Sequence, residues 1–432
     1  MSYSPGTVEM LEGLGASQGD LLEVRSKGDL HSGILMPHHE FSHPDVIVIK
    51  LKSGYNIGIR RGNIEEIRVV EKAGEREVSP GRSGESKADK EVAIIGTGGT
   101  IASYVDYRTG GVHPALSADD LVSAVPEIAD ICRVRAQVLF SIFSENMDVE
   151  CWQRLAGAVA DRLNEGAEGV IIPHGTDTMG YTAAALAFML EDLPRPVLLV
   201  GAQRSSDRPS SDSYTNLLSA ARFCVESDVA EVGVLMHEGP SDTTALVHRG
   251  TRVRKLHTSR RDAFRSVNAR PIARVEFEGG KEILSDHREK SDSKVRVRDS
   301  MEEGVALLHF FPGMSPDRFR EAVLSHSGVV IAGSGLGHVS SPMVSVLEEA
   351  VEQGIPVVMT SQCLYGRVNL NVYDTGRDLL KAGIIPAEDM LPETAYVKLM
   401  WALGQDPDME EVRRIMLTDL RGELSRRREL DE

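Results

Sequence analysis

Hydrophobic and polar positions divide the chain into a short front part and a longer rear part. In the front part, β-prone runs at 21–25, 32–36, 46–51 and 56–60 are separated by clusters of Gly, Pro, Asn and His. Short runs of this composition between turn-forming residues are typical of strands. We therefore predict a small all-β, barrel-like domain of about five strands over residues 1–75.

Residues 76–90 are charged, contain Gly and Ser, and have almost no apolar side chains. Such a segment has little to bury, so it is predicted to be an exposed linker.

From residue 91 onward, short apolar runs alternate with amphipathic segments of helical length. The apolar runs predict buried strands at 92–95, 169–172, 196–200 and 232–236, and the amphipathic segments predict helices at 151–164, 179–191 and 214–225. Alternation of this kind favours a mainly parallel sheet with helices on both faces. We expect a large α/β domain over residues 91–285.

A polar stretch at 286–304 is predicted to connect this domain to a smaller α/β domain at 305–432, where the alternation resumes. The expected strands are 305–310, 329–332 and 356–360, and the expected helices are 318–325, 343–352 and 393–403. The charged tail through Glu432 is predicted to form one more solvated helix. The predicted fold class is therefore α/β, with two α/β domains behind a β-barrel-like domain.

Composition narrows the class of protein. With 432 residues the chain is long enough for two or three domains, and no apolar run approaches the roughly 20 residues of a membrane span. The start of the chain does not resemble a secretory signal. The four cysteines are scattered without a C-x-x-C pair, which argues against a metal site and favours reduced thiols in the cytoplasm. A net charge of −17 disfavours broad contact with nucleic acid by this chain alone.

Three polar turns follow predicted strands: Gly96-Thr97-Gly98-Gly99-Thr100, Ser144-Glu145-Asn146 and His174-Gly175-Thr176-Asp177-Thr178. Ligands of open α/β sheets bind at the carboxyl ends of the strands. The first turn is neither a P-loop nor a dinucleotide fingerprint, since Ile101 stands at the third glycine position. Taken alone, it favours a structural turn.

The turn at 174–178 is more informative, because it places the Thr176 hydroxyl beside the Asp177 carboxylate. Backbone N–H groups at such a turn can stabilise an oxyanion, although an ordinary helix N-cap explains the same residues. Lys255 favours the chemical interpretation: it is the only lysine between Lys90 and Lys281, in a region rich in arginine. A lysine can release its proton and an arginine cannot. Threonine, aspartate and lysine together could activate a hydroxyl nucleophile.

The segments at 95–102 (IGTGGTIA) and 173–179 (PHGTDTM) resemble the two signatures of the bacterial-type L-asparaginase family. The segments at 200–204 (VGAQR) and 311–314 (FPGM) are similar to further family segments. The resemblance covers roughly residues 91–404.

This resemblance implies an amidohydrolase whose nucleophile is Thr100, supported by Thr176, Asp177 and Lys255. It also implies that Asp177 meets the α-ammonium of the substrate. Substrate contacts are expected at Gly99, Ser144, Glu145, Gly175 and Tyr107. The family places an assisting tyrosine after the first signature, and both Tyr104 and Tyr107 are available for this role. Leu336 and His338 stand where bacterial enzymes often carry asparagines.

The front domain, the linker and the segment at 360–374 together resemble the D-subunit family of archaeal glutamyl-tRNA(Gln) amidotransferases. That resemblance implies a homodimer within a heterotetramer that also contains the amidotransferase E subunit. The E subunit would bind ATP and Mg²⁺ and make most contacts with glutamate-charged tRNA(Gln). This chain would bind Gln or Asn and no cofactor of its own.

Three functions follow as hypotheses. The first is release of ammonia from Gln or Asn for that partner, which converts Glu-tRNA(Gln) to Gln-tRNA(Gln). The second is a free-standing L-asparaginase with an added front domain. The third is a non-catalytic scaffold, which the set Thr100, Thr176, Asp177 and Lys255 argues against.

Overall fold

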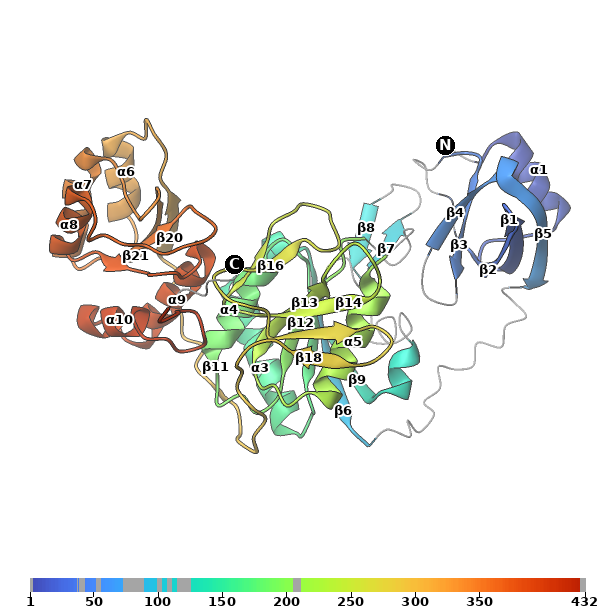
Figure 1. Cartoon of the computed structure of the whole chain (residues 1–432), viewed down its shortest axis with the longest axis horizontal. Helices are drawn as coiled ribbons and strands as arrows, with labels where there is room; N and C mark the ends of the chain where they lie inside the picture. Colours follow the sequence, from blue (N-terminus) through green and yellow to red (C-terminus); the bar gives the residue numbers. More distant parts are fainter. Residues whose placement is uncertain are drawn as a thin grey trace.

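The structure is a computed structural model that describes residues 3–36, 38, 43–51, 56–72, 89–98, 103–106, 111–114, 126–204 and 211–427. It contains a five-stranded front sheet, an eight-stranded central sheet and a four-stranded sheet, in chain order (Figure 1).

The front sheet is antiparallel and has the order β4-β3-β2-β1-β5. Its strands are β1 (Leu21–Ser26), β2 (Asp29–Leu35), β3 (Val46–Leu51), β4 (Asn56–Arg60) and β5 (Ile64–Glu71). Leu22 and Val24 alternate with more exposed residues along β1, as expected for a strand with one buried face. Helix α1 (Pro5–Gly13) packs Leu11 into the same core. The hydrophobic pattern located β1 to β4, but it did not locate β5 and it missed this short helix.

The central sheet has the order β18-β17-β14-β13-β12-β10-β6-β9. The parallel part comprises β6 (Glu91–Gly98), β9 (Arg133–Ile142), β10 (Val170–Pro173), β12 (Val197–Val200) and β13 (Val232–His237). The antiparallel edge comprises β14 (Thr244–Arg249), β17 (Ala273–Glu276) and β18 (Lys281–Ile283).

Helices cover both faces of this sheet, as the alternating pattern predicted. Ile95 and Ile172 point into the core shared with α3 (Val149–Asn164) and α4 (Met179–Met189). Their neighbours Ile94 and Ile171 point into the opposite core, shared with α5 (Ser213–Glu226). Strands buried on both faces read as continuous apolar runs, which is why the sequence located them well.

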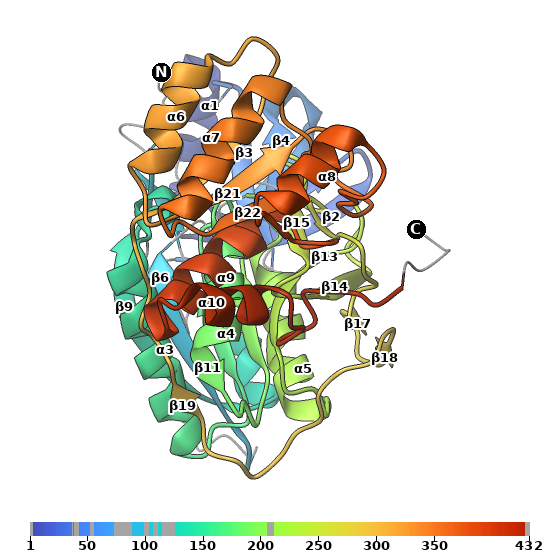
Figure 2. The ribbon, with the colours of Figure 1, turned by 90° about the vertical axis from the view of Figure 1, so that its left-hand side faces the viewer.

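The four-stranded sheet is parallel, with β20 (Val305–His309), β21 (Gly328–Gly333), β22 (Val357–Ser361) and β23 (Ile385–Pro386) in that order. Helices α6 (Pro316–Leu324), α7 (Ser341–Glu352) and α8 (Asp374–Lys381) lie on its outer side. Helix α9 (Pro392–Gln405) covers the other face and packs against α4 of the large domain (Figure 2).

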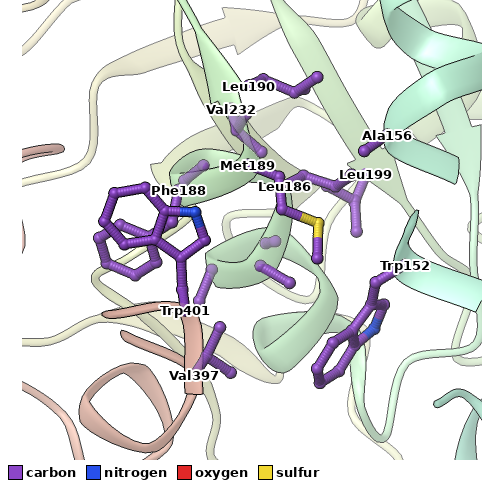
Figure 3. Packing of buried hydrophobic residues seen from close by; sticks show 14 of the residues in the cluster. Trp152, Ala156, Leu186, Phe188, Met189, Leu190, Leu199, Val232, Val397 and Trp401 are labelled. Carbon is purple, nitrogen blue, oxygen red and sulfur yellow. The ribbon is translucent and has the colours of Figure 1, made fainter. Parts of the chain in front are cut away.

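A single apolar core therefore extends from the central sheet through α4 and α9 to the small sheet. The rings of Phe188 and Trp401 stack with their centroids 6.0 Å apart. Figure 3 shows these rings and Trp152 in the same cluster of buried side chains. The Trp401 indole N–H donates to the Arg298 carbonyl at 2.8 Å, so its polar atom is satisfied inside this core. Because both α/β domains share this core, their relative position is set by close packing.

The remaining elements are short. They are the hairpins β7 (Ser103–Asp106) with β8 (Gly111–Pro114) and β15 (Val253–Lys255) with β16 (Phe264–Ser266), the pair β11 (Leu190–Glu191) with β19 (Arg296–Val297), and the 3₁₀ turns Arg61–Asn63, Pro126–Asp130 and Ser144–Asn146. Among the described residues, no helix combines the length and apolarity needed to cross a membrane.

The end of the chain corrects one prediction. Helix α10 (Met409–Met416) is present, but residues 417–427 are irregular rather than helical. Nor is this segment simply solvated: Glu423 is fully buried and pairs with Lys398 of α9 at 2.5 Å. A partner on a distant helix explains why a charged sequence lies inside the protein.

Candidate active site

The turn at residues 173–178 joins the end of β10 to the start of α4. The N-cap of α4 is Thr178, and its hydroxyl donates to the Ser144 carbonyl at 2.6 Å instead of capping the helix. Thr176 and Asp177 therefore lie before the cap, which removes the N-cap explanation of their presence.

Lys255 contacts both Thr176 and Asp177. Its Nζ donates to Thr176 Oγ1 at 2.8 Å and to Asp177 Oδ1 at 2.8 Å. Charge-assisted contacts of this length hold all three side chains in a defined geometry. The sequence analysis expected these three residues to act together, and the structure places them in direct contact.

Exposure differs sharply within this group. The Lys255 side chain is 12% exposed and the Asp177 side chain 73% exposed, while Thr176 is buried. The Asp177 carboxylate is therefore exposed to solvent, whereas Lys255 and the Thr176 hydroxyl are largely covered. Such a graded opening suits a small charged ligand that approaches from the Asp177 side.

The turn at Ser144–Asn146 reaches the same edge of the sheet from the end of β9. A Cβ added to Gly175 would lie 2.7 Å from Ser144 Cβ, so these two predicted contacts touch each other. Ser144 is buried, whereas Glu145 is exposed.

The first signature approaches this edge through β6. Thr97 donates its hydroxyl proton to the Pro173 carbonyl at 2.9 Å, which links the end of β6 to the turn after β10. Gly98 follows with φ of +104°. The expected nucleophile Thr100, together with Gly99 and Tyr107, lies outside the described residues. Tyr104 is a residue of strand β7.

Two residues that sequence reasoning missed support the turn. A Cβ at Gly201 would lie 2.6 Å from Thr176 Cγ2, so only glycine lets β12 end this close to the threonine. His174 is fully buried, and burial lowers the pKa of its imidazole to about 4. Its Nδ1 lies 2.7 Å from the Gly175 carbonyl oxygen, so Nδ1 carries a proton and donates it to that oxygen.

Leu336 and His338, which stand where bacterial enzymes often carry asparagines, follow β21 of the small sheet. The His338 ring packs edge-on against the Tyr373 ring, with their centroids 5.3 Å apart. A cavity of about 300 Å³ lined by Arg249, Arg288 and Arg421 is also separate from the Lys255 contacts. In the described part of the chain, no group of three His, Cys, Asp or Glu side chains could hold a metal ion.

This fold, with a threonine–aspartate turn beside a lysine at the carboxyl ends of parallel strands, defines an asparaginase-like α/β protein. Residues 91–288 match the family model "Asparaginase, N-terminal", and residues 304–416 match "Glutaminase/Asparaginase C-terminal domain". Residues 16–70 match "GatD N-terminal domain". The match of the front domain thus narrows the class to asparaginase-like proteins with a GatD N-terminal domain.

Relatives along the whole chain agree. The chain is 53% identical to the D subunit of glutamyl-tRNA(Gln) amidotransferase from Pyrococcus furiosus, over 96% of this chain and 97% of that protein. It is 48% identical to the protein of that name from Saccharolobus solfataricus, over 100% and 98% of the two chains. The chain belongs to the family of glutamyl-tRNA(Gln) amidotransferase D subunits.

Solved structures resemble the rear part. The thermostable L-asparaginase from Thermococcus kodakarensis is similar with a TM-score of 0.68 and 34% identity, covering 78% of this chain and 99% of that one. L-asparaginase I from Vibrio cholerae gives a TM-score of 0.69 and 30% identity, covering 78% and 100%. These similarities confirm the predicted α/β fold class.

Proposed function

We propose that this chain releases ammonia from the side-chain amide of Gln or Asn, with Thr100 as the nucleophile. The observation that carries the proposal is the position of Lys255 Nζ, 2.8 Å from both Thr176 Oγ1 and Asp177 Oδ1. A hydroxyl needs a neighbouring base before it can attack an amide. The threonine–lysine contact is suited to this task.

The reaction is acyl transfer in two steps. The Thr100 oxygen attacks the amide carbon while its proton passes to the relay formed by Thr176 Oγ1 and Lys255 Nζ, which lie 2.8 Å apart. The C–N bond then breaks, the nitrogen takes up the proton, and ammonia leaves an ester on Thr100. Water attacks the ester and releases the carboxylic acid. Backbone N–H groups of the glycine-containing turns stabilise the negative oxygen in both steps.

Substrate binding follows from the same turns. Asp177, which is exposed and negatively charged, binds the α-ammonium of the amino acid. Gly99, Ser144, Glu145, Gly175 and Tyr107 provide further contacts. The reaction needs no cofactor in this chain.

We further propose that the ammonia passes to a partner, the amidotransferase E subunit, in a heterotetramer built on a homodimer of this chain. The partner would use ATP and Mg²⁺ to activate glutamate on tRNA(Gln) and would make most of the tRNA contacts. Membership of the D-subunit family supports this assignment. So does the net charge of −17, which is unfavourable for a surface that grips tRNA itself.

The test is ammonia release from glutamine and from asparagine by the purified full chain, first alone and then with the E subunit, ATP, Mg²⁺ and glutamate-charged tRNA(Gln). A sharp rise only with the complete set is the expected result. Fast release that ignores the partner would instead favour a free-standing L-asparaginase, the alternative suggested by the similarity of 78% of the chain to such enzymes. Unchanged function in Thr100→Ala would support the non-catalytic scaffold.

A further inference from the structure

Lys255 lies on a hairpin outside the central sheet. Strands β15 and β16 pair only with each other in the described sheet topology, with Lys255 opposite Phe264. The backbone ladder that holds Thr176 therefore does not extend to Lys255. Other contacts must set the position of the ammonium.

At the first end of the hairpin, Arg252 is 1% exposed and points into the small domain and the chain end. Its guanidinium donates to the Asp389 carbonyl at 3.0 Å, the Gly422 carbonyl at 2.8 Å and Ser425 Oγ at 2.8 Å. It also pairs with the Asp389 carboxylate at 3.2 Å. A planar guanidinium with several fixed donors holds such a set better than an ammonium does.

At the second end of the hairpin, Asn268 also bonds to Asp389 of the small domain. Its side-chain amide donates to the Asp389 carbonyl at 2.9 Å and to the Gly366 carbonyl at 3.1 Å. The Gly366 N–H donates back to Asn268 Oδ1 at 2.9 Å. Asn268 has φ of +56°, a conformation that asparagine tolerates better than most residues do. Both ends of the hairpin therefore converge on Asp389.

The chain end is itself fixed to the small domain. The Ser425 N–H donates to Asp389 Oδ1 at 3.0 Å. Glu423 pairs with Lys398 of α9 at 2.5 Å, with both side chains fully buried. Residues 421–425, here called the closing segment, are therefore fixed to the small domain through Glu423 and Ser425, while Arg421 donates to the Ala187 carbonyl of the large domain at 2.7 Å.

The far end of the hairpin contacts the large domain, where Arg261 donates to Asp242 at 2.6 Å. Lys255 lies three residues after Arg252 and six before Arg261. The small-domain bonds of Arg252 are therefore nearer to Lys255 than the Arg261 contact is, while Val253 and Phe264 pack the hairpin against the core that includes α4.

We infer that Arg252, Asp389 and the closing segment are positioning elements through which the small domain sets Lys255 against Thr176 and Asp177. This inference rests on the proposed function for its effect on turnover. Lys255 Nζ keeps two contacts of 2.8 Å, and a misplacement of about 1 Å in a reacting geometry can cost about 10²-fold in rate. The described side-chain bonds of Arg252 and Asp389 go to the small domain, the hairpin ends and the closing segment, so both residues act on the amine indirectly.

Arg252→Lys and Ser425→Ala test this in the full chain. Arg252→Lys keeps the positive charge but loses the planar guanidinium with its several donors. Ser425→Ala removes one of the acceptors of the Arg252 guanidinium, with little risk to folding. Thr360→Val is the control, because the Thr360 hydroxyl is buried within the small domain, where it donates to the Ile331 carbonyl at 2.9 Å. The measurements are kcat and KM for ammonia release, and hydrogen exchange of the amides at 253–266.

For Arg252→Lys we expect kcat to fall about 10- to 10²-fold, with KM changed less than about two-fold and faster exchange across the hairpin. Ser425→Ala should show the same pattern more weakly, and Thr360→Val should show neither change. Wild-type kcat and exchange in a folded Arg252→Lys, or in Ser425→Ala if the former does not fold, would overturn the inference. So would an equal loss in the control.

The two readouts separate this inference from the proposed function. If no amide releases ammonia from the wild-type protein under any condition, the proposed function fails, and faster exchange in the variants would still show that Arg252 and Ser425 hold the hairpin. If ammonia is released but hairpin exchange is unchanged in the variants, the inference fails and the proposed function stands.

Discussion

The two halves of the candidate site are held in different ways. The turn at 173–178 continues β10, which pairs on both sides with the parallel strands β6 and β12. The hairpin at 253–266 lies outside that sheet and is held by side chains, notably Arg252 at one end and Asn268 at the other. Its link to the central sheet includes the contact between His248 and Ser266 at 2.9 Å.

The two halves of the site should therefore respond to changes in different parts of the protein. Thr176 should respond to changes in the large domain, where its surroundings are close-packed backbone. Lys255 should also respond to changes in the small domain, because its hairpin depends on Asp389. The Thr176–Lys255 contact therefore reports on how the two domains fit together.

The largest effect is expected from removing the contact itself. Lys255→Met should lower kcat for ammonia release by about 10²–10⁴-fold, since it deletes the proposed proton acceptor. Lys281→Met, on the exposed edge strand β18, is the matched control and should retain wild-type rates. Similar rates in the two variants would remove Lys255 from the mechanism.

The next effect acts through the small domain. Lys398→Met should lower the free energy of unfolding by about 3–5 kcal/mol, because Glu423 is left as a buried charge without its cation. Thermal or urea unfolding measures the change. Lys381→Met breaks the exposed pair with Asp378 and should cost at most about 1 kcal/mol. Equal stability of both variants would contradict the structural importance of the buried pair.

A change in the large domain should reach Thr176 with a smaller effect. Gly201→Ala places a Cβ 2.6 Å from Thr176 Cγ2, so the threonine must shift, and kcat should fall by about 10²-fold. Hydrogen exchange of the hairpin should stay unchanged. Gly157→Ala in α3 meets no neighbour within 4 Å and should gain roughly 0.5–1 kcal/mol of stability with unchanged kcat. Wild-type activity in Gly201→Ala would show that the turn can adjust.

The smallest effect concerns pH. Burial lowers the pKa of His174, at the turn, to about 4 and that of His248, beside the hairpin, to about 3. The unfolded chain binds these protons near pH 6.5 and the native protein does not, so stability falls as the pH drops below about 6.5. From pH 7 to 5.5 each imidazole should cost about 1 kcal/mol.

Replacing either buried histidine by glutamine should flatten this slope of stability against pH. His257→Gln, at an exposed position, should leave the slope as it is. A slope that survives both buried substitutions would assign the pH dependence to other groups.

The sequence predicted those features that depend on local patterns. Buried parallel strands read as apolar runs, and the Thr176–Asp177 turn was recognisable because it follows one of them. Lys255 was singled out by its isolation among arginines. That reasoning could not locate the hairpin, because Arg252 and Asn268 find their partner Asp389 more than a hundred residues away.

The same limit explains the error at the chain end. The tail through Glu432 is polar and charged, so it was predicted to be a solvated helix, and residues 417–427 are not helical. Their conformation instead depends on the buried pair of Glu423 with Lys398 and on the contact of Ser425 with Asp389. Such compensation between distant charges leaves no local periodicity. The close approach of Gly201 to Thr176 is equally invisible until the strands are side by side.

The central claim is that Thr100 carries the acyl group during amide hydrolysis. The most direct test is to add hydroxylamine to the glutamine reaction and to measure the hydroxamate that forms when it intercepts the ester. We expect hydroxamate from the wild-type protein, much less from Lys255→Met, and none from Thr100→Val. Ammonia release without hydroxamate at any hydroxylamine concentration, or undiminished hydroxamate from Thr100→Val, would contradict the account.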